Sequence, residues 1–364
     1  MNRYPLDATF ELTLRCNLEC KMCMFRRADQ QEMLPRELST GQWIDLAKQA
    51  AQAGTLSLLL TGGEPLMRGD FPQLYEGIYA QGFLLTLYTN GTLVTDRVME
   101  VLQKMPPHRI GVTLYGISNA DYAEVCGCPD GFDRAMEGLA KLMTLPSAVE
   151  VRFTPTRDTI GKFRELDKLV FDRFGTHVTI SSRVFRAVRG GCMKPETCRP
   201  DPQQVVEATW GQVQQRLLES IPPELLDKVQ LRIYDSCSIP SGEKTLLGCN
   251  AGMNSYTITW DGKLLGCQLL DAFSADALKE GLAAAWERFP ETVKYPPHPC
   301  GDCAYLETCT LCPAVAVAET GSLTGVPEYI CEITKETQKR KEAFTLHEKD
   351  ILQAPGGVGS HSPL

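Results

Sequence analysis

The chain has 364 residues, of which 43% are hydrophobic and 23% charged, as in a folded globular protein rather than a disordered one. Its formal net charge is −8, which argues against a basic face for nucleic acid or membrane. No apolar run approaches the ~18 residues that span a bilayer, and the first residues lack the apolar core of a signal peptide. We therefore expect a cytoplasmic protein, whose 15 cysteines are metal ligands more readily than disulfides.

The first half of the chain alternates between two kinds of segment. Apolar runs rich in β-forming residues predict strands at 8–14, 56–60, 83–88, 110–114, 149–153 and 177–180. Helical patterns lie between them at 39–53, 70–81, 95–104, 132–143 and 160–174, and Ser39 with Gln42 fits a capping box. Continuous apolar strands that alternate with helices indicate a parallel sheet covered on both faces. The expected fold class is α/β, with a partial (β/α)6 barrel over residues 1–200.

The pattern changes after residue 186, where glycines and prolines become frequent. A helical stretch over 202–218 leads us to assign residues 201–236 to a helical bridge. Residues 237–331 are rich in loops, hold eight cysteines and contain one predicted hairpin, over 256–266, that turns at Asp261-Gly262. Such a segment buries little apolar area, so we expect bound metal to hold its shape. A charged helix at 332–352, expected to contact the first domain, and a tail at 353–364 complete the chain.

Three cysteines directly follow the first predicted strand, in the order Cys16-x3-Cys20-x2-Cys23. In α/β barrels the loops at the carboxyl ends of the strands carry the chemistry. Three thiolates in one short loop leave one position of a metal site open, and thiolates select iron–sulfur, zinc or copper(I). A fragment of a zinc ribbon and a set of unrelated buried thiols are the alternatives.

The second predicted strand ends in Thr61-Gly62-Gly63-Glu64-Pro65, at the same edge of the sheet. Paired glycines let a ligand approach the backbone closely, and a strand edge can bind an amine or amide through main-chain groups. Taken alone, this segment could equally be a strand-to-helix turn. Its position beside the cysteine loop favours a shared site.

These two motifs resemble those of the radical S-adenosylmethionine (radical SAM) superfamily. The resemblance implies that Cys16, Cys20 and Cys23 hold a [4Fe–4S] cluster, whose remaining iron takes the amino and carboxylate groups of S-adenosylmethionine. Gly62, Gly63 and Glu64 would then frame the methionine end of that cofactor. The full cofactor-binding set implied is Met22, Gly62, Gly63, Glu64, Thr113 and Arg134, with Arg152 as the open alternative to Arg134 for the carboxylate. Met22 stands where the family commonly has an aromatic residue.

The remaining cysteines of the C-terminal half resemble the SPASM extension of radical SAM enzymes, whose seven-cysteine pattern binds auxiliary clusters. Family topology implies one auxiliary [4Fe–4S] cluster on Cys249, Cys267 and Cys312, with Cys237 as a candidate fourth ligand. It implies a second on Cys300, Cys303, Cys309 and Cys331. The spacing from Cys309 to Cys312 is one residue shorter than the usual pattern.

Zinc is the alternative for these rear cysteines, because CxxC pairs bind it readily. Four further cysteines fit no cluster pattern, and we expect them to be ordinary buried thiols: Cys126, Cys128, Cys192 and Cys198.

The resemblance implies three [4Fe–4S] clusters and an oxidoreductase that cleaves S-adenosylmethionine to methionine and a 5′-deoxyadenosyl radical, which abstracts hydrogen from a substrate. Auxiliary clusters suit removal of an electron from the product, so net oxidation or cross-linking is favoured. SPASM enzymes act mainly on peptides, so the leading substrate is a ribosomal precursor peptide, as in biosynthesis of ribosomally made, modified peptides (RiPPs). A sugar or aminocyclitol dehydrogenase is the main alternative, and a non-catalytic electron carrier or zinc scaffold is the third.

Gln268 stands where sulfatase-maturating relatives carry an aspartate, so we do not expect formylglycine formation. The partners implied are a flavodoxin- or ferredoxin-type reductant and, because only about six residues precede the first strand, a separate leader-binding protein. No nucleic-acid or membrane partner is expected.

Overall fold

The computed structural model describes residues 3–25, 30–180, 184–187, 191, 192, 194–220, 251–288, 299, 300, 302–306, 308, 309 and 311–342. The predicted tail at 353–364 and residues 221–236 of the predicted bridge lie outside these described residues.

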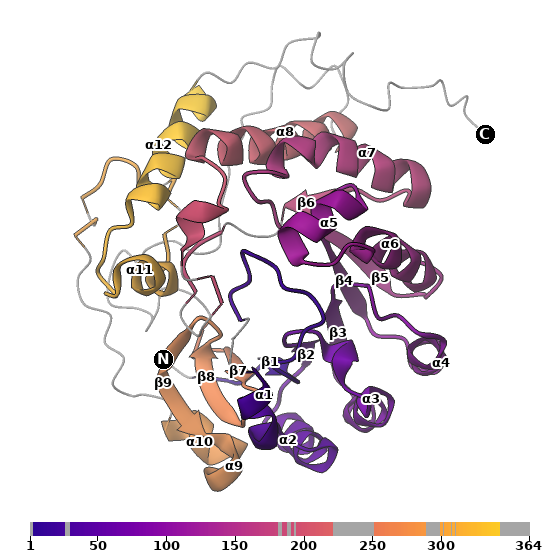
Figure 1. Ribbon diagram of the computed structural model, residues 1–364. Helices are drawn as coiled ribbons and strands as arrows, with labels where there is room; N and C mark the ends of the chain where they lie inside the picture. Colours follow the sequence, from indigo (N-terminus) through magenta and orange to yellow (C-terminus); the bar gives the residue numbers. More distant parts are fainter. Residues whose placement is uncertain are drawn as a thin grey trace.

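Six parallel strands form an arc with helices along its outer side (Figure 1). The strands are β1 (Asp7–Glu11), β2 (Ser57–Thr61), β3 (Leu84–Thr89), β4 (Arg109–Leu114), β5 (Ala148–Phe153) and β6 (Val178–Ile180). The helices between them include α2 (Thr40–Gln52), α3 (Phe71–Tyr79), α4 (Asp96–Lys104), α6 (Gly131–Leu142) and α7 (Phe163–Phe174). Short elements are α1 (Gln30–Met33), η1 (Leu34–Arg36), η2 (Pro65–Met67), η3 (Ile160–Lys162) and η4 (Pro195–Thr197). This arrangement confirms the predicted partial barrel.

Side chains on the outer side of the strands form the main core. Phe10 of β1 is fully buried, with its ring centroid 5.0 Å from that of Trp43 on α2. Burying a side chain of this size stabilises the fold by about 1.5–3 kcal/mol. Ser39 accepts a hydrogen bond from the backbone N–H of Gln42 and completes the predicted capping box at the start of α2. Core burial and capping therefore place α2 where the sequence predicts it.

One helix near the cysteine loop was not predicted. This helix, α5 (Asn119–Cys126), begins at Ser118, which caps it, and ends at Gly127, whose φ of +64° is left-handed. The main-chain carbonyl of Cys126 accepts a hydrogen bond from the N–H of Glu19 at 2.7 Å. The carboxyl end of α5 therefore supports the loop that carries the first cysteines.

The sheet continues into the C-terminal half of the chain. Strand β7 (Ser255–Ile258) pairs in parallel with β1, and β8 (Lys263–Cys267) and β9 (Leu270–Asp276) follow antiparallel, in the order β6-β5-β4-β3-β2-β1-β7-β8-β9. The hairpin turns at Asp261-Gly262 as predicted, with Gly262 at a φ of +88°. Helices α9 (Ala277–Glu280) and α10 (Leu282–Arg288) lie beside α2, where the N–H of Leu282 donates to Gln49 at 2.8 Å. The hairpin is thus an extension of the barrel sheet.

Of the last two described helices, the second packs on α8 (Pro202–Ser220), and Ala316 of the first joins the same buried cluster. They are α11 (Pro313–Thr320) and α12 (Glu328–Glu342), which starts four residues before the predicted charged helix. Val206 of α8 and Ile330 and Ile333 of α12 share one buried cluster. The guanidinium of Arg199 lies 3.9 Å from the ring centroid of Tyr329, which further fixes α12. The helix was expected to contact the first domain; most of its packing is on α8, and it reaches residues 1–200 where the Tyr329 hydroxyl donates to the carbonyl of Pro200 at 2.8 Å.

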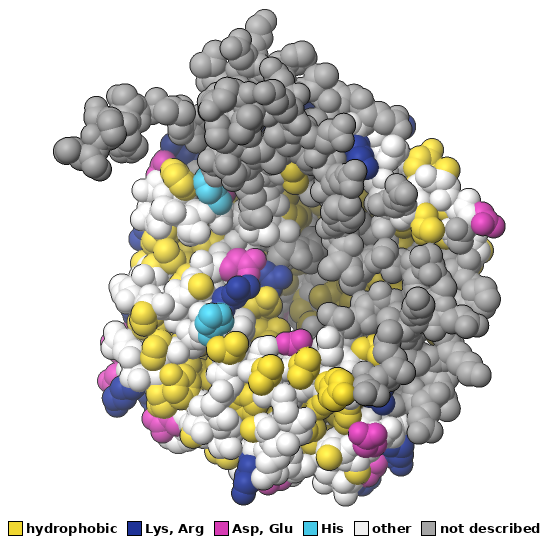
Figure 2. All heavy atoms as spheres, turned by 180° about the vertical axis from the view of Figure 1, so that it is seen from behind, with side chains coloured by type: hydrophobic (Ala, Val, Ile, Leu, Met, Phe, Trp, Pro, Cys, Tyr) yellow, Lys and Arg dark blue, Asp and Glu magenta, His cyan; other side chains and the backbone are white. Residues whose placement is uncertain are grey.

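Hydrophobic side chains and charges of both signs are interspersed on the face opposite that of Figure 1 (Figure 2). Leu56 and Leu84, at the amino ends of β2 and β3, are among the exposed large hydrophobic residues of the protein. Among the described residues, no helix is both long and apolar enough to cross a bilayer.

Candidate functional site

The two motif-bearing strands stay hydrogen-bonded beyond their regular ends. The N–H of Gly63 donates to the carbonyl of Thr13, and that of Glu64 to the carbonyl of Arg15, both at 2.8 Å. A Cβ on Gly63 would lie only 2.3 Å from the Arg15 oxygen, and Gly62 has a φ of +146°, so both positions need glycine. The N–H groups of Gly63 and Glu64 therefore already have acceptors. An amino group bound at this edge would meet main-chain carbonyl oxygens rather than N–H groups.

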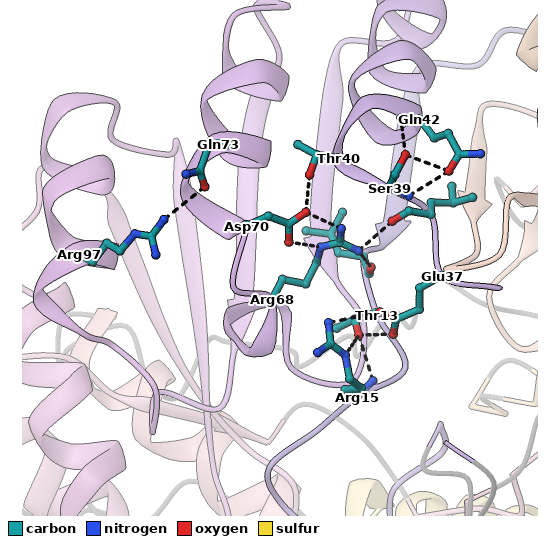
Figure 3. A network of polar contacts seen from close by, with 12 residues as sticks. Thr13, Arg15, Glu37, Ser39, Thr40, Gln42, Arg68, Asp70, Gln73 and Arg97 are labelled. Atoms are coloured by element: carbon teal, nitrogen blue, oxygen red, sulfur yellow. Dashed lines mark hydrogen bonds and ion pairs between the residues drawn. The ribbon is translucent and has the colours of Figure 1, made fainter. Parts of the chain in front are cut away.

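A charged network fixes the segment between β1 and the first cysteine (Figure 3). The hydroxyl of Thr13 donates to Glu37 at 2.5 Å, and the guanidinium of Arg15 lies 3.3 Å from the same carboxylate. Arg68 is buried and forms two parallel bonds to Asp70, at 2.9 and 2.7 Å. It also donates to the carbonyl of the residue before Thr13 at 2.9 Å. Bidentate pairs of this kind are among the stronger polar contacts in proteins, so they give the loop a rigid base.

Glu64 joins the end of β2 to the end of β3. Its carboxylate is 1% exposed and accepts bonds from the Thr89 hydroxyl at 2.8 Å, the Leu66 N–H at 3.1 Å and the Asn90 N–H at 2.7 Å. Burial raises the pKa of Glu64 to about 7, against the opposing effect of these three donors. The side chain is therefore part of the frame of the site, with its oxygens directed at the backbone.

Main-chain and side-chain donors point at the sulfurs of the cysteine loop. Cys16 Sγ accepts from the N–H of Leu18 at 3.5 Å and from the side-chain amide of Asn90 at 3.9 Å. Cys23 Sγ accepts from the N–H of Phe25 at 3.4 Å. Donors to sulfur stabilise a thiolate, so this loop is built to hold charged sulfur.

The front thiols fit an iron–sulfur cluster. Burial raises the pKa of Cys16 far above its usual value, and the charges of Glu64, Cys20 and Cys23 raise it further. Thiolates packed this closely need a positively charged partner. Among the described residues, no three cysteine, histidine or acidic side chains converge as a single metal ion requires. Cysteine thiolates are the ligands that [4Fe–4S] clusters take, so the donor set of this loop fits such a cluster.

A cavity of about 340 Å³ lies over the cysteine loop and the glycine edge. It is lined by most of the predicted set, namely Cys16, Cys20, Met22, Cys23, Gly62, Gly63, Glu64 and Thr113. It is also lined by residues that sequence reasoning did not select, which include Tyr88, Asn90, Tyr115, Thr154 and Val184. Cavities of this size hold ligands as large as a nucleoside with a side arm.

The two candidate arginines stand differently relative to the cavity. Arg134 does not line the cavity, because it lies on α6 and pairs with Asp130 at 3.6 Å. Arg152 of β5 lines it instead, with its guanidinium carbon 4.4 Å from the ring centroid of Tyr88. The Nε of Arg152 is buried without a hydrogen-bond partner, and Glu150 is 4.0 Å away. Alternation along β5, where residue 152 stands between two buried apolar residues, was the signal that could have separated the two.

Of the four rear cysteines assigned to one cluster, Cys300 and Cys309 pack against the buried cluster that includes residues of α8, α11 and α12, and Cys331 lies on α12. Burial raises the pKa of Cys300, and the charges of Cys331, Cys303 and Cys309 raise it further. The pKa of Cys331 is raised by burial and then by Cys309, against the opposing charge of Lys335. The negative charges of these thiolates would raise one another's pKa values, and bound iron would offset that repulsion.

The other rear set is described only in part. Cys267 and Cys312 pack against one small cluster that contains Leu270 and Ala314. Cys237 and Cys249 lie outside the described residues. Gln268, which follows Cys267, lines the central cavity, so this half of the set lies at the edge of the site.

The four unassigned cysteines are all buried, as expected. Cys128 Sγ donates to Asp130 at 3.3 Å.

Comparisons with known sequences agree with this site. The profile of the Radical SAM superfamily matches residues 10–148. The AdoMet-dependent heme synthase of Methanosarcina barkeri is 25% identical over 341 residues, which are 88% of this chain and 95% of that protein. The Fe-coproporphyrin III synthase of the same organism is 22% identical over 330 residues, 82% of this chain and 81% of its own.

Other relatives match over a shorter span. The PqqA peptide cyclase of Rhizobium meliloti is 33% identical over 132 residues, which are 36% of this chain and 35% of that protein. Two further heme synthases match over only 43% and 41% of their own length.

Solved structures show the same fold. Streptococcus suis SuiB bound to S-adenosylmethionine has a TM-score of 0.65 at 17% identity, over 90% of this chain and 77% of that one. Native anSMEcpe with bound AdoMet and the Kp18Cys peptide has a TM-score of 0.67 at 15% identity, over 92% and 96%. The chain therefore carries a radical SAM domain over residues 10–148, in the partial-barrel fold of radical SAM enzymes.

Proposed function

We propose that this chain is a radical SAM oxidoreductase that uses auxiliary iron–sulfur clusters to oxidise a peptide substrate. Cys16, Cys20 and Cys23 would hold the front cluster, which supplies the electron that splits S-adenosylmethionine into methionine and a 5′-deoxyadenosyl radical. The second and third clusters would bind at the two rear cysteine sets. The protein's own part is to position the cofactor and substrate and to keep water out.

Different residues of the cavity would bind different parts of the cofactor. The carbonyl edge at Gly62 and Gly63 would accept the cofactor's amino group, since its amides are used by the cysteine segment. Arg152 carries a buried Nε without a hydrogen-bond partner and would pair with the carboxylate. Met22, apolar and buried beside the cysteines, would pack against the adenine.

The observation that carries the oxidative proposal is the neighbourhood of Gln268. This residue reaches the central cavity, and its chain neighbour Cys267 belongs to a rear cysteine set. A cluster held there would lie near enough to the substrate to accept an electron after hydrogen abstraction. Such proximity suits net oxidation better than a rearrangement, which needs no electron acceptor.

A peptide is the leading substrate class. The cysteine pattern resembles that of SPASM enzymes, most of which act on peptides. The match to the PqqA peptide cyclase supports the same class. The fold is also that of SuiB and anSMEcpe, which have been crystallised with peptides.

A tetrapyrrole is the second candidate, because two relatives that align along most of this chain are the AdoMet-dependent heme synthase and the Fe-coproporphyrin III synthase of Methanosarcina barkeri. The two can be separated with the anaerobically reconstituted protein, S-adenosylmethionine and dithionite. We expect 5′-deoxyadenosine and a mass change in a short peptide encoded beside the gene. Conversion of Fe-coproporphyrin III, with an unchanged peptide, would overturn the peptide assignment and favour the second candidate.

A further inference from the structure

Two side chains of the central cavity, Tyr88 and Arg152, come from strands that are not neighbours. Tyr88 lies on β3 and Arg152 on β5, and each stands between two buried residues of its strand, so both point to the inner face of the sheet. Strand β4 runs between them, and its residue opposite Tyr88 is Gly111. Both side chains line the cavity. They therefore meet across the position of Gly111.

The glycine at position 111 makes room for this contact. The guanidinium carbon of Arg152 lies 4.4 Å from the ring centroid of Tyr88. A Cβ on Gly111 would lie 2.7 Å from two ring carbons of Tyr88 and 3.4 Å from Cδ of Arg152. A larger residue there would push the ring away. The ring and the arginine chain thus fill the space that a side chain on β4 would otherwise take.

Stacking on the ring matters because a hydrogen bond does not fix the Nε of Arg152. This atom is buried without a hydrogen-bond partner, and the carboxylate of Glu150 is 4.0 Å away, beyond hydrogen-bond distance. A guanidinium is attracted to the face of an aromatic ring, and this attraction uses none of its N–H groups. The ring of Tyr88 can therefore hold the guanidinium while its donors remain for a ligand.

We propose that Tyr88 is a positioning residue, whose ring holds the Arg152 guanidinium in place for the carboxylate of S-adenosylmethionine, and that Gly111 keeps the ring there. This inference rests on the proposed function, which assigns the carboxylate to Arg152. The role belongs to the aromatic face, because the guanidinium lies over the ring. A side chain that is already held in its binding position loses less freedom when the ligand arrives, which strengthens binding.

The test is calorimetry with the anaerobically reconstituted holoprotein and two ligands. One is S-adenosylmethionine, and the other is decarboxylated S-adenosylmethionine, which keeps the amino group and lacks only the carboxylate. Tyr88→Leu removes the aromatic face and should weaken binding of S-adenosylmethionine about fivefold, with no change for the decarboxylated form. Tyr88→Phe keeps the face and should bind both ligands as the natural protein does.

Two further variants test the geometry. Gly111→Ala should displace the ring and weaken binding of S-adenosylmethionine alone, whereas Gly41→Ala, at an exposed position with no atom within 4 Å of the added Cβ, should change neither affinity. Adding Tyr88→Leu to Arg152→Gln should weaken binding no further than Arg152→Gln does, because the ring acts through the arginine.

Unchanged binding of S-adenosylmethionine in Tyr88→Leu would overturn the proposal. An equal loss for both ligands would also overturn it, because it would show a structural role alone. So would a Tyr88→Phe variant as weak as Tyr88→Leu, since the hydroxyl would then be the group that matters.

The variant Arg152→Gln separates this inference from the proposed function. If it binds both ligands as the natural protein does, the assignment of the carboxylate to Arg152 fails, and the role of Tyr88 fails with it. If it loses affinity for S-adenosylmethionine while Tyr88→Leu does not, the assignment of the carboxylate stands and only the role of Tyr88 is overturned.

Discussion

Substitution of Glu64 offers the sharpest test of what holds the strand ends beside Gly62 and Gly63 in place. The Glu64 carboxylate accepts from Thr89, Leu66 and Asn90, and these bonds join the end of β2 to the end of β3. In Glu64→Gln the carboxamide oxygen can still face Thr89 and Leu66. The carboxamide NH2 group must then face the main-chain N–H of Asn90. That N–H loses its acceptor, which in the natural protein is a Glu64 carboxylate oxygen at 2.7 Å.

The size of this effect follows from burial. A buried main-chain donor left without an acceptor costs about 1–3 kcal/mol. We therefore expect Glu64→Gln to lower the local stability of the β2–β3 edge by about 2 kcal/mol, which is about a thirtyfold change in an opening equilibrium.

Hydrogen–deuterium exchange, read by mass spectrometry on peptides that cover residues 84–92, measures this opening directly. Asn90 should exchange about thirtyfold faster in Glu64→Gln, while peptides from α6 should not change. Glu76→Gln makes the same chemical change on an exposed site of α3 and should alter stability by less than about 0.5 kcal/mol. Unchanged exchange at Asn90 in Glu64→Gln would refute the role assigned to this carboxylate.

Three further predictions concern the cavity, the rear cysteines and the buried carboxyl group of Glu64. Arg152→Gln should weaken S-adenosylmethionine binding at least about tenfold by calorimetry, because the charged pair with the carboxylate is lost. Arg134→Gln should bind the cofactor as the natural protein does. The reverse ranking would assign the carboxylate to Arg134. Replacing Cys300 and Cys303 by alanine should make residues 299–342 sensitive to limited proteolysis and leave the barrel resistant, and equal resistance would show that iron does not hold this region. Burial raises the pKa of Glu64 from an ordinary 4.5 to about 7. Between pH 4.5 and 7 the folded chain therefore keeps a proton on Glu64 that the unfolded chain has released. Stability should therefore fall as pH rises from about 4.5 to 7, by at most about 3 kcal/mol, and the melting temperature of Glu64→Gln should lack this slope.

Local pattern predicted the barrel well because buried parallel strands are continuous apolar runs. The six strands were predicted within a few residues, and Ser39 and Gln42 located the start of α2 correctly. Helix α5 was missed because residues 119–126 mix polar and apolar types without a clear helical stripe, and only the folded chain buries Tyr122 and Val125. The parallel pairing of β7 with β1 joins residues about 250 positions apart, and no local pattern encodes such a contact.

The candidate site divides in the same way. Cysteine spacing was enough to group Cys16 with Cys20 and Cys23, since all three lie on one loop. The choice between Arg134 and Arg152 needed the direction of a strand side chain, which spacing does not give. The hydrogen bond from the N–H of Cys192 to the carbonyl of Cys23 depends on how one distant segment folds against the cysteine loop, which spacing does not give either.

The measurement that tests the central claim most directly is 5′-deoxyadenosine formation by the anaerobically reconstituted protein with S-adenosylmethionine and dithionite, alongside its iron content. The natural protein should form 5′-deoxyadenosine and carry about twelve iron atoms, four for each of three clusters. The triple variant Cys16→Ala, Cys20→Ala, Cys23→Ala should form none and keep about eight iron atoms, because the rear cysteines are a separate group. A triple variant that still cleaves S-adenosylmethionine, or a natural protein that holds zinc and only about four iron atoms, would contradict the account.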